Sequence, residues 1–183
     1  MAVEDYLKQA RKTKEELNNI SSSMCMAKWL QVSLHLPQGL TQSCYHPPTH
    51  SIPLDELKDN PTALHNTKEK FNQRKQMLNG ERPSGCQYCW NIEDAKDGPH
   101  LSDRHYRSSE WWVGTDGWKE VVENDWNNNI NPRYVEVNFN QACNFKCTYC
   151  SPHLSTAWEK EINKHGPIKM STYTHNDPEY LEE

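Results

Sequence analysis

Three cysteines lie within eight residues near the C-terminal end of this sequence. Cys143, Cys147 and Cys150 have the spacing C-x3-C-x2-C and follow a strand-like run over residues 133–140. Three thiolates on one short loop can hold three corners of a [4Fe–4S] cubane, which usually has four cysteine ligands. No cysteine follows Cys150, so one iron of such a cluster would be open to a different ligand.

Zinc is an alternative metal for this loop. Zinc also takes sets of three Cys and one His, and His153 follows the loop closely enough to be the fourth ligand. We favour the cluster over zinc, and both over inert thiols, and interpret His153 as an ordinary loop residue.

Four further cysteines lie upstream, and we expect them to form a second set. Cys86 and Cys89 form a C-x2-C pair on a glycine-bearing turn, a spacing that directs two thiols toward one metal. An expected strand hairpin carries Cys25 back toward Cys44. Four thiolates suit a structural zinc site or an iron–sulfur cluster, and we favour iron.

The composition is polar for a folded domain. The 183 residues are 34% hydrophobic, and their mean hydropathy is −1.02, whereas ordinary domains are about 45–50% apolar with Gly counted. Burial alone offsets the conformational entropy of such a chain poorly. Since metal binding can contribute folding free energy directly, and 7 Trp and 8 Tyr argue against simple disorder, we expect a metal-stabilised globular protein.

Charge and hydropathy bear on which partners and which cellular compartment we expect. The net charge is −5, and no basic tract favours nucleic-acid binding. The first residues lack the basic start and apolar run of a signal peptide, and no stretch approaches the ~20 apolar residues of a membrane span. We therefore predict a cytoplasmic protein without a membrane segment, in which cysteine sets are more often metal ligands than disulfides.

Periodicity predicts the elements that position the upstream thiols. A helix is expected over 3–20 and a hairpin over 29–44, where apolar and polar residues alternate before a turn at Pro37-Gln38-Gly39. A short helix is expected over 53–58. A longer one is expected over 61–78, with Asn60 as N-cap and Gly80 in the C-terminal cap.

The middle of the chain is predicted to be a polar linker, residues 98–132. Arg104 and Arg107 could hold a carboxylate or phosphate, but we favour a solvated connection. Four tryptophans are expected to cover core or interface surface rather than to stack on nucleic acid: Trp111, Trp112, Trp118 and Trp126.

The elements around the three-thiol loop predict a βα unit of a parallel barrel. Alternating Val135, Val137 and Phe139 indicate a strand over 133–139. A helix fits 155–165, because Gly166 and Pro167 stop it. The polar tail, residues 169–183, is expected to fray.

The three-thiol loop resembles the signature of the radical S-adenosylmethionine (SAM) superfamily, which has an aromatic residue, here Tyr149, just before the last cysteine. The resemblance implies that Cys143, Cys147 and Cys150 hold a [4Fe–4S] cluster. It also implies that the open iron binds the amino and carboxylate groups of SAM, with Tyr149 near the adenine. Reductive cleavage of SAM then gives a 5′-deoxyadenosyl radical, and no catalytic side chain beyond the cluster is assigned.

Residues 25–89 resemble the SPASM and twitch accessory domains of radical SAM enzymes. The shared order is a cysteine, a hairpin, a second cysteine, a helix and a terminal C-x2-C. The resemblance implies an auxiliary [4Fe–4S] cluster on Cys25, Cys44, Cys86 and Cys89. In those enzymes the module more often follows the barrel, whereas here it precedes the three-thiol loop.

The predicted fold is therefore α+β. We expect an N-terminal helix (1–20), a metal-stapled twitch-like domain (21–97), the linker (98–132) and the start of a partial (β/α)6 radical SAM barrel (133–183). Only 33 residues follow Cys150, about one βα unit at ~30 residues each. We thus expect the N-terminal portion of a longer or split protein, inactive alone. Two alternatives stay open: a second polypeptide that completes the barrel, and a remnant that only binds clusters.

The resemblance also implies partners. A reducing protein such as flavodoxin or ferredoxin would supply electrons, and the substrate would be a peptide, a protein or a small molecule. Two other functions stay open: a zinc-stabilised, non-enzymatic interaction module, and a two-cluster electron-transfer protein.

Overall fold

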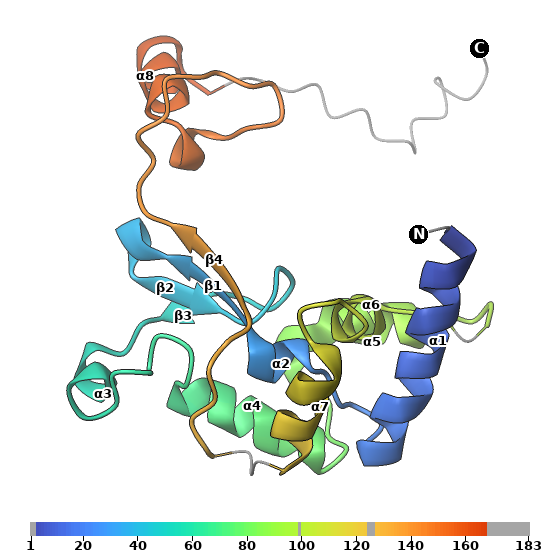
Figure 1. Cartoon of the computed structure of the whole chain (residues 1–183). Coiled ribbons are helices and arrows are strands. Elements are labelled where there is room, and N and C mark those ends of the chain that lie inside the picture. Colours follow the sequence, from blue (N-terminus) through green and yellow to red (C-terminus); the bar gives the residue numbers. More distant parts are fainter. Residues whose placement is uncertain (1–2, 99, 124–126, 168–183) are drawn as a thin grey trace, which may run out of the picture. The chain divides into compact units, whose positions relative to one another are not determined.

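Helices and one small mixed sheet make up the part of the chain that the structure describes, residues 3–98, 100–123 and 127–167 of a computed structural model (Figure 1). The chain divides into two units, 1–139 and 140–183. The predicted α+β class is confirmed at this level. In chain order the elements are α1 (Val3–Ile20), α2 (Ala27–Leu30), β1 (Gln31–His35), η1 (Leu36–Gln38), β2 (Leu40–Gln42), β3 (His50–Ser51), α3 (Leu54–Asp59), α4 (Lys68–Leu78), η2 (Ser84–Cys86), α5 (Gln87–Glu93), α6 (Asp103–Ser108), α7 (Gly114–Glu123), β4 (Tyr134–Asn138), η3 (Pro152–Leu154) and α8 (Thr156–His165).

The sheet has the strand order β3-β2-β1-β4 (Figure 1). The predicted hairpin is confirmed: β1 and β2 are antiparallel, with Leu34 opposite Thr41. Its turn closes at Gly39, whose φ of +65° lies in the left-handed region that glycine adopts without strain. The hairpin carries the chain from α2, just after Cys25, to Cys44, just after β2.

The predicted strand over 133–139 is present as β4, and it joins the sheet that contains the hairpin. β4 pairs in parallel with β1, so that Val32 lies opposite Val135 and Leu34 opposite Val137. Strand β4 thus belongs to the sheet of unit 1, whereas the cysteine loop and α8 belong to unit 2. The physical reason is that β1 has a second edge, whose backbone donors and acceptors need partners.

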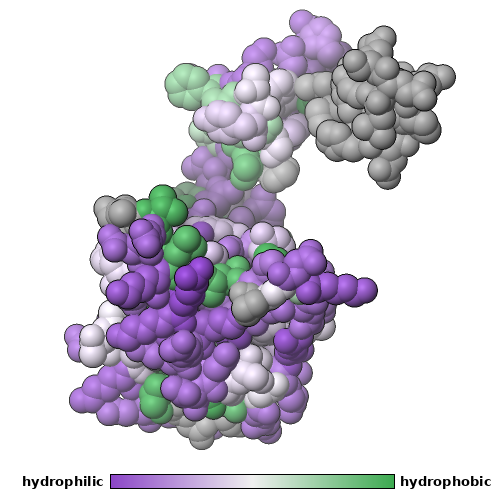
Figure 2. Space-filling model, turned by 90° about the vertical axis from the view of Figure 1, so that its right-hand side faces the viewer, coloured by the Kyte–Doolittle hydropathy of each residue, from purple (hydrophilic) through white to green (hydrophobic). Residues whose placement is uncertain are grey.

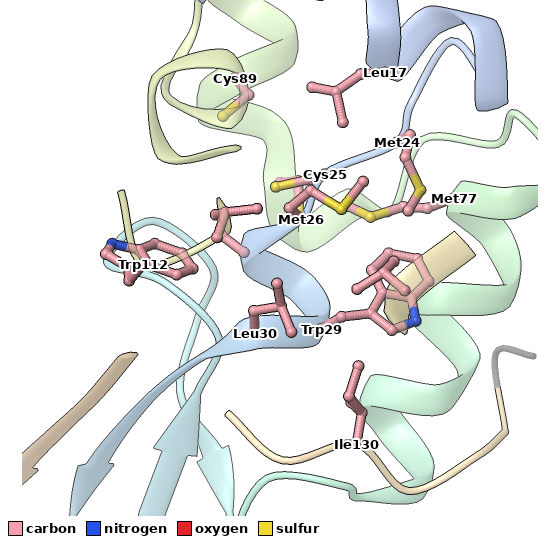
Figure 3. Close-up of a cluster of buried hydrophobic side chains, with 14 of the residues drawn as sticks. Leu17, Met24, Cys25, Met26, Trp29, Leu30, Met77, Cys89, Trp112 and Ile130 are labelled. Carbon is pink, nitrogen blue, oxygen red and sulfur yellow. The ribbon is translucent and has the colours of Figure 1, made fainter. Parts of the chain in front are cut away.

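The core of unit 1 lies among the helices and is rich in sulfur and indole side chains. Figure 3 shows Leu17, Met24, Trp29 and Met77 in one cluster with Cys25 and Cys89. Trp29 is 1% exposed, and Met24 and Leu17 are fully buried. Flexible methionines and large indoles can fill this core densely, which compensates for the few aliphatic residues of the chain.

The longer predicted helix begins later than expected. Helix α4 starts at Lys68, because the side chain of Thr67 caps it by accepting a hydrogen bond from the Lys70 backbone N–H. Asn60, the predicted cap, instead accepts a hydrogen bond from the Thr62 backbone N–H at 3.1 Å within a turn. The C-terminal expectation is confirmed, since Gly80 has a φ of +76° after the helix.

Residues 98–132 do not form the expected linker, because they contain α6 and α7 and contribute to the core. Trp112, Val113, Val121 and Ile130 are each 6% exposed or less. Ser102 and His105 form a capping box at the start of α6. The segment was predicted to be a linker because most of its side chains are polar, although it contains the short helices α6 and α7. Among the tryptophans of this segment, Trp112 covers core as expected, Trp111 is 87% exposed, and Trp126 lies outside the described residues.

Unit 2 is described from residue 140 to residue 167. The predicted helix is confirmed as α8, with Ser155 as N-cap and Gly166 at its C-terminal end with a φ of +81°. The prediction for the tail over 169–183 lies outside the described residues.

Polar side chains cover much of the surface of unit 1 that one view shows (Figure 2). The face of unit 1 drawn in Figure 2 is largely hydrophilic, with apolar side chains scattered over it. None of the helices in the described ranges has the length and apolar character that crossing a membrane requires.

Candidate metal centres

The four upstream cysteines come together in unit 1. Cys25 precedes α2, Cys44 follows β2, Cys86 ends η2 and Cys89 lies in α5, and all four line one cavity. Cys25, Cys86 and Cys89 are 6–8% exposed, and Cys44 is partly buried. The structure therefore joins three distant segments into the thiol set that the spacing suggested.

Local hydrogen bonds hold the C-x2-C turn in place. The Cys86 backbone N–H donates to the Pro83 carbonyl at 3.0 Å, and the Trp90 indole N–H donates to the same carbonyl at 3.0 Å. Trp90 is 2% exposed, so this turn is fixed against the core. Cys89 lies on the first turn of α5, one turn beyond Cys86, which directs both thiols to one side.

The upstream thiols are free, and the pKa values of three of them are raised. All seven cysteines lie in the described part of the chain, and none of them forms a disulfide. Burial and then the neighbouring thiols raise the pKa of Cys25 to about 12, and burial raises the pKa of Cys89 to about 11. Burial also raises the pKa of Cys44, while the charge of Lys28 opposes that rise. A metal that binds here must therefore displace protons from the thiols.

The chemistry of the donor set fits a metal, because several thiols that share one cavity are soft ligands for zinc or iron. The cavity itself is small, about 20 Å³, which is room for about one water. Across the described ranges, no group of three or more His, Cys, Asp or Glu side chains is placed to hold a single metal ion.

A buried ion pair supports one wall of this cavity. Arg104, 3% exposed, donates to both carboxylate oxygens of Glu93 at 2.7 and 2.9 Å and to the Met24 carbonyl at 2.9 Å. Burial would raise the pKa of Glu93, but the hydrogen bonds from Arg104 and Ser102 outweigh it, and the pKa is lowered. The carboxylate that Arg104 holds is thus an internal one, and the expected solvated connection is wrong at this residue.

The three cysteines of unit 2 lie on a loop that wraps around the start of α8. Cys143, Cys147 and Cys150 are all partly exposed. The Ser155 hydroxyl, fully buried, donates to the Phe145 carbonyl at 2.7 Å and to the Cys143 carbonyl at 3.2 Å. The same oxygen caps α8 by accepting from the Trp158 backbone N–H, so one side chain ties the helix to the loop.

Further bonds from α8 fix the loop backbone. The Thr156 hydroxyl donates to the Cys143 carbonyl at 3.0 Å, and the Trp158 indole N–H donates to the Cys147 carbonyl at 3.0 Å. These contacts occupy loop carbonyls, and the positive end of the α8 dipole lies at the loop, where it favours negative charge such as thiolate. The sequence placed Ser155 at the helix start, but it gave no signal that Ser155, Thr156 and Trp158 bind the loop.

Tyr149 is the exposed aromatic residue of the loop. Its side chain is 91% exposed, and a hydrogen bond with Cys147 raises its pKa. Phe145, on the same loop, is 67% exposed. The loop thus exposes two aromatic rings in the same eight residues as its three thiols.

No family model, curated protein or solved structure matches this chain. The likeness to radical SAM enzymes therefore depends on the two cysteine patterns of the chain.

Proposed function

We propose that this protein binds two [4Fe–4S] clusters and belongs to the radical SAM enzymes. Cys143, Cys147 and Cys150 would hold the cluster that binds SAM. The four-thiol set of unit 1 (Cys25, Cys44, Cys86 and Cys89) would hold the auxiliary cluster. When bound, the SAM-binding cluster would supply the one-electron chemistry that cleaves SAM to a 5′-deoxyadenosyl radical and methionine.

One observation supports this proposal above the others. Four cysteines from three separate segments line one buried cavity, and none of them forms a disulfide. Buried thiols in such a group are expected to be metal ligands in a reducing compartment. The set in unit 2 has three cysteines rather than four, in the spacing C-x3-C-x2-C. A structural zinc would need a fourth protein ligand, whereas a cubane on three cysteines would keep one iron open for SAM.

The residues of unit 2 have separate roles in this proposal. The loop thiols would hold three irons, and the hydrogen bonds of Ser155 and Thr156 to the Cys143 carbonyl would keep the loop in shape. Tyr149 would lie near the adenine of SAM. The substrate would be a peptide, a protein or a small molecule, and a reducing protein such as flavodoxin or ferredoxin would supply electrons.

The experiment is anaerobic purification, reconstitution with iron and sulfide, and metal analysis. We expect a brown protein with roughly eight irons per chain, four for each cubane. A Cys147→Ser variant should keep about half of this iron, and a Cys86→Ser variant should keep the complementary half. The matched pair assigns each half of the iron to one thiol set.

Binding of SAM is tested on the reduced protein. After dithionite reduction, SAM should change the electron paramagnetic resonance spectrum of the wild-type chain and of Cys86→Ser, but not that of Cys147→Ser. A colourless protein that takes up zinc or cobalt and no iron would sink the proposal and favour a zinc-stabilised interaction module. Two clusters that are reduced reversibly without any response to SAM would favour an electron-transfer protein.

A further inference from the structure

Three cationic side chains are buried in unit 1, and one of them, Lys28, lines the four-thiol cavity. Lys28 is 2% exposed, and Lys70 and Arg74 are fully buried. Among the described residues, none of the three forms an ion pair with a carboxylate. Glu69, next to Lys70 in sequence, instead accepts a hydrogen bond from the Gln73 side-chain amide at 3.3 Å. A buried charge without a counter-charge is costly, so the fold needs negative charge at this place.

The hydrogen bonds of these side chains involve neutral acceptors. Lys70 Nζ donates to the Thr41 hydroxyl at 3.3 Å and to the Gln42 carbonyl at 3.4 Å. Arg74 donates to the Asn66 side-chain oxygen at 2.9 Å. These bonds satisfy donors, but they leave the net positive charge uncompensated. Burial, followed by the charges of Lys28 and Arg74, lowers the pKa of Lys70 well below its usual value, as expected for crowded cations.

The cations extend from the cavity wall into the core. Lys28 lines the cavity together with the four cysteines, and its ammonium donates to the Gln73 side-chain oxygen at 2.6 Å. Arg74 Nε donates to the Lys28 carbonyl at 3.2 Å. The carbonyl that Lys70 contacts belongs to Gln42, two residues before Cys44. In contrast, Arg104 at the same cavity has its own carboxylate, Glu93.

We propose that Lys28, Lys70 and Arg74 are the built-in counter-charge of a negatively charged thiolate–metal centre in the four-thiol cavity. Four thiolates carry more negative charge than a zinc ion or the iron–sulfide core of a cubane neutralises. The centre and the cations therefore stabilise each other across a low-dielectric core. This inference rests on the proposed metal role of the four thiols, but it does not depend on which metal binds.

The test measures metal affinity in the full chain with the other thiol loop disabled by Cys147→Ser and Cys150→Ser. Zinc is titrated against a chromophoric chelator for the parent, for Lys70→Met and for the control Lys119→Met, whose side chain is 71% exposed in α7. Methionine is close to lysine in length but lacks the charge. We expect Lys70→Met to weaken zinc binding by roughly tenfold, the scale of a partly screened charge interaction inside a protein, and Lys119→Met to leave it unchanged.

A second measurement separates lost charge from disturbed packing. In urea unfolding, Lys70→Met should raise the midpoint of the metal-free chain, because it removes an unpaired buried cation, and should lower the midpoint of the zinc-loaded chain. Damaged packing would lower both midpoints. If the metal-free chain does not fold, the affinity ratio alone decides.

The outcomes separate this inference from the proposed function. Equal zinc affinities for Lys70→Met and Lys119→Met would overturn the counter-charge, even in a protein that binds both clusters. Weakened zinc binding in a chain that never takes iron would support the counter-charge while the iron–sulfur function fails. A chain whose four thiols bind neither zinc nor iron would overturn both.

Discussion

The two cysteine sets of this protein differ in how the fold builds them. The four-thiol set draws on three segments between Cys25 and Cys89, lies in the core of unit 1 and shares its cavity with buried cations. The three-thiol set occupies one loop between Cys143 and Cys150, is partly exposed and is held by the start of one helix. The first is a property of tertiary structure, and the second is a property of local sequence.

From this difference we expect the four-thiol set to contribute more to stability and the three-thiol set to contribute more to chemistry. A centre that links distant segments contributes its binding free energy to folding. A centre on one loop can lose its metal while the rest of the chain stays folded, and it keeps its thiols accessible to a small molecule.

The largest effect is expected from Cys86→Ser. Loss of one ligand from the four-thiol centre should lower the free energy of unfolding of the metal-loaded chain by about 4 kcal/mol or more. Chemical denaturation of the reconstituted protein measures this. Cys147→Ser is the matched comparison and should leave the unfolding of unit 1 unchanged. Equal losses from the two variants would contradict the contrast.

A large effect is also expected from Arg104→Met. The change leaves the buried Glu93 carboxylate without its partner, which typically costs about 3–5 kcal/mol. The control is Arg82→Met, because Arg82 pairs with Asp94 at 2.7 Å on the surface, where both side chains are 42% or more exposed. That change should cost less than about 1 kcal/mol. Similar unfolding midpoints for the two variants would show that burial does not set the strength of this pair.

A smaller effect is expected in unit 2 from Ser155→Ala. The change removes the cap of α8 and two hydrogen bonds to the loop, which should cost about 1–2 kcal/mol locally. Hydrogen exchange of the α8 amides should become faster, and the three-thiol loop should retain less iron. Thr148→Ala, at an exposed position of the same loop, should change neither. Unaltered exchange in Ser155→Ala would show that the hydrogen bonds of this side chain do not stabilise the contact between α8 and the loop.

The smallest effect concerns pH and His50 of unit 1. Burial, followed by the charge of Lys70, lowers the pKa of His50 from 6.5 to about 4. Between these values the unfolded chain binds a proton that the folded chain does not, so stability falls as the pH drops from 6.5 toward 4. His50→Gln should make the denaturation midpoint less steep with pH in this window. His165→Gln, with a side chain 59% exposed in α8, is the control, and identical slopes for wild type and His50→Gln would count against the prediction.

Local patterns predicted much of the secondary structure. Helix α1 follows from periodicity alone. The β1–β2 hairpin and α8 follow from periodicity together with Gly39 in the turn and Gly166 after the helix, because these signals act within a few residues. The predicted start of α4 was wrong because Asn60 and Thr67 are both good N-cap residues. Only the packing of the segment between them selects Thr67. Helices α6 and α7 were not predicted, because their polar residues outnumber the few, widely spaced apolar ones.

The candidate sites show the same division. The spacing C-x3-C-x2-C placed Cys143, Cys147 and Cys150 on one loop without any knowledge of the fold. Grouping Cys25 and Cys44 with the C-x2-C pair needed a guess about a hairpin, which the structure supports. Lys70 and Arg74 gave no signal in the sequence, since lysine and arginine in a helix are usually exposed.

Near neighbours in the chain account for the thiol spacings, the glycines after α4 and α8, and the alternation of β1. Contacts between distant segments account for the pairing of β4 with β1, for the burial of Trp112, Val113, Val121 and Ile130, and for the burial of Lys28, Lys70 and Arg74. The reason is physical. Backbone preferences and caps depend on near neighbours, whereas the burial of a charge or the choice of a sheet edge depends on which distant segments exclude water from it.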